Sequence, residues 1–128
     1  MDATSMAMQG TNTGFIAEHR LWSREVFNAS SDWIGVFESA NCRVEYWVPR
    51  ERDAQDAHDQ DEIYVVTQGT GAFRMRQRIR AVHAGDLIFV PAGELHRFEA
   101  FSEGFSVWVV HLPERAHASP HVAVAAPR

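Results

Sequence analysis

The feature of this chain that most limits its fold is a series of short apolar runs separated by turn residues. No long stretch between residues 33 and 112 carries apolar residues at the spacing of an amphipathic helix. Short runs rich in β-branched and aromatic residues, divided by glycine, proline and asparagine, are typical of antiparallel sandwiches and barrels. The predicted strands are 33–38, 42–48, 62–68, 73–80 with a hairpin turn near 76–78, 87–90, 95–101 and 105–112. The fold class that follows is all-β and antiparallel.

The length of the chain predicts one domain. A chain of 128 residues can bury about two-thirds of its unfolded surface. We place the domain at residues 14–115, because residues 1–13 are small and polar and residues 116–128 are rich in alanine, proline and histidine. Both ends are predicted to be disordered tails.

The charge and hydropathy of the chain limit the classes of partner that it is expected to bind. The net charge of −5 argues against a nucleic acid or an anionic membrane as the main partner. The chain has no apolar run of the roughly 18 residues that a membrane span needs, and its start lacks the features of a secretory signal. A single cysteine, Cys42, excludes an internal disulfide. We therefore predict a cytoplasmic protein whose partner is a small molecule.

A histidine and a glutamate stand close together where one of the predicted strands begins. His58 and Glu62 stand four residues apart, and the run that follows ends at Gly69. If the strand begins at His58, alternation places Gln60 and Tyr64 on the same face as these two residues. Imidazole nitrogen and carboxylate oxygen bind Fe, Zn, Ni, Mn and Co, so this face predicts a metal site.

A third candidate ligand follows a second short strand. The run 87–90 ends in the turn Pro91-Ala92-Gly93, and a new strand begins at His96. His58, Glu62 and His96 would form a set of two histidines and one carboxylate. Such a set leaves coordination positions open and suits non-haem Fe(II) oxygenases, as well as metals that hydrolyse or isomerise.

These two stretches together resemble the paired motifs of the cupin superfamily. The first motif has a His-x-His pair, a glutamate, and a glycine after six further residues. The places of its second histidine, glutamate and glycine are filled by His58, Glu62 and Gly69. The second motif, a glycine, a Pro-x-Gly turn and a histidine, is met without a gap by Gly85, Pro91, Gly93 and His96. Asp56 stands in the place of the first histidine.

The resemblance implies a jelly-roll β-barrel that holds one divalent transition metal ion per chain. Its implied ligands are His58, Glu62 and His96, and the fourth position is open to Asp56, Gln60 or a water. Small cupins of this kind commonly form homodimers, and Trp33 or Trp47 would suit such an interface.

Several other side chains have alternative interpretations. Tyr64 carries a phenol on the face of Glu62 and is the candidate catalytic residue. The position of His111 at the end of the last strand does not decide whether its ring points inward. The apolar wall of the barrel is predicted to come from Tyr64, Val66, Phe89, Phe98 and Trp108. A row of four arginines either binds an anionic substrate or forms a solvated outer face, which is the commoner outcome; it comprises Arg74, Arg76, Arg78 and Arg80.

Two classes of function remain. The first is a metal-dependent enzyme, such as a dioxygenase, isomerase or cyclase, that acts on a small organic substrate inside the barrel. The second is a binding or sensing module without turnover. A sensor usually needs an attached output domain, for which the chain has no room, so the enzyme is favoured. A fold of this type hosts many chemistries and does not decide between the two.

Overall fold

The structure is a computed structural model that describes residues 16–18, 32–50 and 57–113, and these residues contain eight β-strands. The predicted tails at 1–13 and 116–128, and Asp56, lie outside the described residues. No helix among the described residues is long and apolar enough to cross a membrane. The strands are β1 (Trp33–Glu38), β2 (Arg43–Trp47), β3 (Glu62–Gln68), β4 (Thr70–Met75), β5 (Arg78–His83), β6 (Leu87–Val90), β7 (His96–Phe101) and β8 (Ser106–His111).

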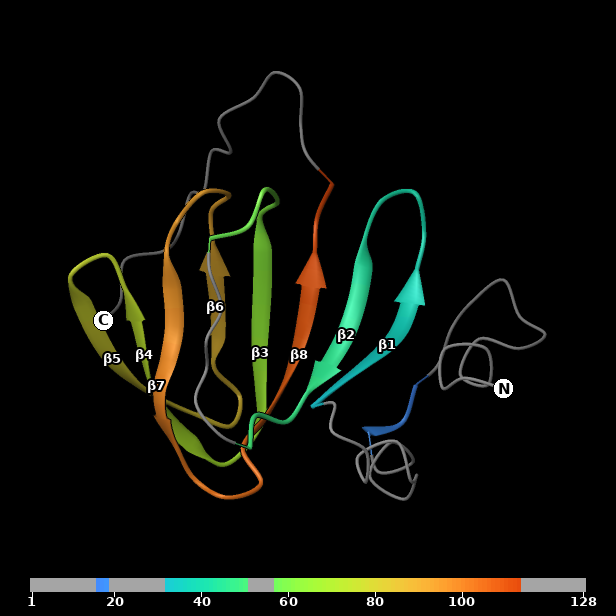
Figure 1. Cartoon of the computed structure of the whole chain (residues 1–128). Coiled ribbons are helices and arrows are strands. Elements are labelled where there is room, and N and C mark those ends of the chain that lie inside the picture. Colours follow the sequence, from blue (N-terminus) through green and yellow to red (C-terminus); the bar gives the residue numbers. More distant parts are fainter. Residues whose placement is uncertain (1–15, 19–31, 51–56, 114–128) are drawn as a thin grey trace.

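The strands form two sheets in which every neighbouring pair is antiparallel (Figure 1). The larger sheet has the order β1-β2-β8-β3-β6, and the smaller has the order β5-β4-β7. The chain thus passes repeatedly between sheets, as in a jelly roll. The predicted fold class is confirmed, and the predicted turn in the run 73–80 falls at Arg76, whose φ is 58°, and Gln77.

A core between the sheets holds them together. Alternation along β3 turns Glu62, Tyr64 and Val66 inward, and all three are buried. The ring of Phe98 from β7 lies across from them, with its centroid 5.5 Å from that of Tyr64. The same ring is 4.9 Å from Phe73 of β4. Aromatic pairs at these separations favour a fixed arrangement, so the inward face of β3 meets a rigid wall.

The larger sheet also buries apolar side chains on its other face. A second cluster there contains Ile34, Val36, Tyr46 and Val48, with Trp108 and Ile16 packed against it. Two predictions about the barrel wall are therefore wrong. Trp108 packs on Tyr46 at 4.8 Å in this outer cluster. Phe89 is the cross-strand partner of Ile63, on the face opposite Tyr64 and Ile88. Because both faces of the sheet bury apolar groups, hydrophobicity alone does not identify the inner one.

Trp47 belongs to the core and is not a surface residue. It is 3% exposed and stacks on Trp33, with ring centroids 4.7 Å apart. Its other side contacts Phe98 at 5.7 Å. The prediction that Trp47 suits a dimer interface is therefore wrong, because the ring is already covered within one chain.

Candidate metal centre

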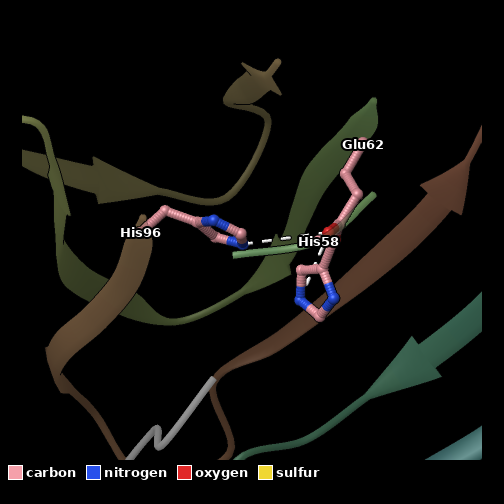
Figure 2. Close-up of side chains that lie close together, drawn as sticks. All are labelled: His58, Glu62 and His96. Carbon is pink, nitrogen blue, oxygen red and sulfur yellow. Dashed lines mark ion pairs between the residues drawn. The ribbon is translucent and has the colours of Figure 1, made fainter. Parts of the chain in front are cut away.

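The three ligands expected from the motifs come together at one end of the core. Glu62 begins β3 and is fully buried, and His96 begins β7 at 2% exposure. His58, from the loop before β3, reaches the same place, as Figure 2 shows. One ligand atom from each residue lies within 4.8 Å of the others. Separations of this size allow one cation to contact all three atoms, with small adjustments of the side chains.

The turn of the second motif holds the loop of the first motif. The amide of Gly93 donates a hydrogen bond of 2.8 Å to the carbonyl oxygen of His58. Next to it, the amide of Ala92 donates to Oδ1 of Asp61 at 2.8 Å. Gly93 has a φ of 83°, a conformation that glycine adopts without strain. The Pro-x-Gly turn therefore positions His58 as well as His96.

The alternation argument assumed a strand that begins at His58, and this assumption is wrong. Residues 58–61 form a loop, and β3 starts at Glu62. His58 is placed by its hydrogen bond to Gly93 and not by strand alternation. The argument that put Gln60 on the face of Glu62 is therefore wrong, although Gln60 is half-buried in the same loop. Ligation by Gln60 stays a prediction, as does ligation by Asp56.

The hydrogen bonding of the group suits a cation. The Nδ1 of His96 lies 2.8 Å from the carbonyl oxygen of Glu94 and must donate to it, so a neutral ring presents the lone pair of Nε2 to the site. The Oε1 of Glu62 is buried and accepts no hydrogen bond from any residue that the structure describes, and it lies 3.3 Å from Nε2 of His58. A buried carboxylate oxygen without a donor is costly. A divalent ion would satisfy both this oxygen and the histidine lone pair, so the residues fit a metal.

Tyr64 faces the group, as predicted. Its hydroxyl donates to Oε2 of Glu62 at 2.9 Å and lies 2.9 Å from Nε2 of His96. The side chain is fully buried, and the rings of Phe73 and Phe98 contact it. The phenol therefore has a fixed place beside two of the candidate ligands.

Two further residues extend this group, since His111 lies beside Glu62 and Glu45 lies beside His111. The sequence left the orientation of His111 open and did not single out Glu45. His111 of β8 is the cross-strand partner of Glu62 and is buried. Its Nδ1 is 4.0 Å from Oε2 of Glu62, and its Nε2 is 2.6 Å from Oε1 of Glu45 on β2. This contact with His111 lowers the pKa of Glu45, and Arg43 lowers it further, while burial opposes both. The alternation of Val107, Val109 and His111 was visible in the sequence, but the neighbours of β8 were not.

Comparison with known proteins agrees with this arrangement. The family described as "Cupin domain" matches residues 43–112, which is more than half of the chain. The chain belongs to this family. The chain is 39% identical over 61 residues to an "uncharacterized protein" of Streptomyces coelicolor. It is also 37% identical over 76 residues to an acireductone dioxygenase of Frankia alni.

These similarities cover parts of each protein. The first match includes 48% of this chain and 58% of the Streptomyces protein. The second includes 56% of this chain and 33% of the dioxygenase. Among solved structures, a protein of Shewanella frigidimarina with a cupin-2 domain superposes with a TM-score of 0.63 over 77% of this chain and 94% of its own, at 19% identity. KdgF from a Halomonas species gives 0.58 over 65% and 80%, also at 19% identity. At these identities the structural matches show the fold.

Proposed function

We propose that this cupin is a metal-dependent dioxygenase that acts on a small organic substrate, with one divalent transition metal ion held by His58, Glu62 and His96. The observation that carries the proposal is the convergence of three ligand atoms within 4.8 Å, one of which is a buried carboxylate oxygen with no hydrogen-bond donor among the described residues. Two histidines and one carboxylate form the ligand set of non-haem Fe(II) oxygenases. Asp56, Gln60 or a water would complete the coordination.

The similarity to the acireductone dioxygenase supports oxygen chemistry over other metal-dependent reactions. When bound, the metal would supply a Lewis acid and open positions for substrate and dioxygen. The protein would supply the other requirements. The rings of Phe73 and Phe98 pack on Tyr64 beside the group, and they hold the Tyr64 hydroxyl where it can give or take a proton at Glu62. A homodimer in the cytoplasm remains the expected setting.

Metal content and oxygen consumption test this proposal. Untagged protein, purified without chelators, is analysed for metals and then loaded with Fe(II), and dioxygen uptake is followed with phenols and catechols as candidate substrates. We expect about one transition metal ion per chain and substrate-dependent uptake. Metal without oxygen uptake would point to an isomerase or a cyclase. A protein that takes up no metal after reconstitution would be a binding module, and the proposal would be wrong.

A further inference from the structure

The four arginines of the row face opposite sides of the smaller sheet. The turn at Arg76 and Gln77 joins β4 to β5, and it changes which positions face inward. On β4, Arg74 faces outward, where its guanidinium pairs with Glu99. On β5, Arg80 is the cross-strand partner of Phe73, and Arg78 is the partner of Met75. Cross-strand partners share a face of a sheet. Because Phe73 faces the core, Arg78 and Arg80 lie on the inner face of the smaller sheet.

These two arginines line a cavity of about 440 Å³. The cavity lies between β5 and β6, which are the edge strands of the two sheets. Its apolar lining comes from Phe73, Met75 and Ile88, and its charged lining from Arg76, Arg78 and Arg80. Ligand sites of this size are commonly apolar, with a few polar groups that fix orientation.

The positive charge in the cavity is only partly neutralised. Arg76 pairs with Glu94 at 2.7 Å. Neither Arg78 nor Arg80 forms an ion pair within the part of the chain that the structure describes. The whole chain carries a net charge of −5, so this concentration of guanidinium groups opposes the overall charge. Such a pair of groups favours an anion at this place.

The floor of the cavity is also a wall of the metal centre. The ring of Phe73 is 6.1 Å from that of His96 and 6.1 Å from that of Tyr64. Met75 is the cross-strand partner of His96. A molecule that lies along Phe73 and Met75, with its anionic end at β5, would therefore extend toward the candidate metal ligands.

We propose that Arg78 and Arg80 bind the carboxylate of a small organic acid whose apolar body lies on Phe73 and Met75. The inference deepens the proposed function, on which it rests, by assigning the substrate class to organic acids. A guanidinium offers a planar pair of donors that match both oxygens of a carboxylate. Contact with the apolar floor would stabilise a bound molecule that has a hydrocarbon body, and inorganic anions have none.

Binding of matched acids and amides tests the inference. Affinities for benzoate, 3-phenylpropionate, the two corresponding amides and inorganic phosphate are measured by calorimetry or NMR titration on the full chain. The test variant is Arg78→Gln with Arg80→Gln. The control is Arg74→Gln with Arg97→Gln, which removes the same charge from the outer face, where both arginines pair with Glu99. Metal content and the circular dichroism spectrum are recorded for every sample.

We expect the wild type to bind at least one acid tenfold or more tightly than its amide and than phosphate. The inner-face variant should lose at least tenfold in that affinity, while the outer-face control changes less than threefold. Three results would each overturn the inference: equal losses of affinity in the two variants, equal affinity of the wild type for an acid and its amide, or equal affinity of the wild type for an acid and phosphate. Failure of the wild type to take up metal would instead overturn the proposed function. Metal content is measured separately from acid binding, so the two failures can be told apart.

Discussion

The hydroxyl oxygen of Tyr64 lies 2.9 Å from Nε2 of His96, and the same hydroxyl donates to Glu62. A phenol has one proton, so it satisfies only one of these two acceptors at a time. Tyr64 therefore links a strand of each sheet through the two candidate ligands that are most deeply buried. The same geometry makes it possible to separate the role of the hydroxyl from the roles of the ligands.

Replacing Tyr64 with phenylalanine should lower turnover without loss of metal. The aromatic ring would keep its contacts with Phe73 and Phe98, and the ligand atoms would stay in place. Loss of a positioned proton donor typically costs about 10²- to 10⁴-fold in rate. Single-turnover kinetics and elemental analysis of the same samples measure the two effects. A variant that loses its metal would show that the hydroxyl supports ligation and not proton transfer.

Removing either candidate histidine should remove the metal. In His58→Ala or His96→Ala, only two of the three ligands remain, and we expect occupancy to fall to near background. The β-rich circular dichroism should be retained, because the core between the sheets is formed by other residues. Elemental analysis after dialysis measures the occupancy. Full occupancy in both variants would refute the ligand assignment.

Two controls distinguish ligation from a general effect of surface charge or histidine number. His83 on β5 is exposed and pairs with Asp86, so His83→Ala should keep the metal. Asp59 is exposed in the loop beside His58, and Asp59→Asn should change metal affinity by less than about twofold if the carboxylate lies outside the coordination shell. A large loss in the Asp59 variant would mean that the loop rearranges when metal binds.

His111 should affect metal affinity without being a ligand. Its ring lies between Glu45 and Glu62, and groups that orient a ligating carboxylate typically contribute about 10- to 100-fold to metal affinity. We expect a loss in this range for His111→Gln, measured by competition with a chelator. The melting temperature of the metal-free protein is recorded in parallel. Unchanged affinity with a lower melting temperature would assign His111 to stability alone.

Tyr46 should contribute to stability in a pH-dependent way. Burial, together with its hydrogen bond to Glu18, raises the pKa of Tyr46 from 10.0 to about 12. The unfolded chain therefore loses this proton before the folded chain does. The resulting stability is complete below pH 10 and is lost as the pH rises from about 10 to about 12, by roughly 2 to 3 kcal/mol. Urea unfolding across this range should show a shallower decline for Tyr46→Phe, and parallel curves would contradict the assignment.

The sequence by itself determined the local elements and the identities of the candidate ligands. The predicted strands 62–68 and 87–90 have the same bounds as β3 and β6, because β-branched residues bounded by glycine and proline define a strand locally. The spacing of Gly85, Pro91, Gly93 and His96 identified the second motif, since a tight turn requires particular residues at fixed offsets.

The tertiary structure decided which strands are neighbours and which face of each is covered. Alternation shows which side chains share a face, but it does not show whether that face meets the other sheet or an outer cluster. The placements of Trp47, Phe89 and Trp108 were wrong for this reason. His111 meets Glu62 because β8 pairs with β3, and Arg78 and Arg80 face the cavity because the turn at Arg76 changes the alternation. Contacts between segments distant in the chain depend on the packing of the whole domain, which no local pattern encodes.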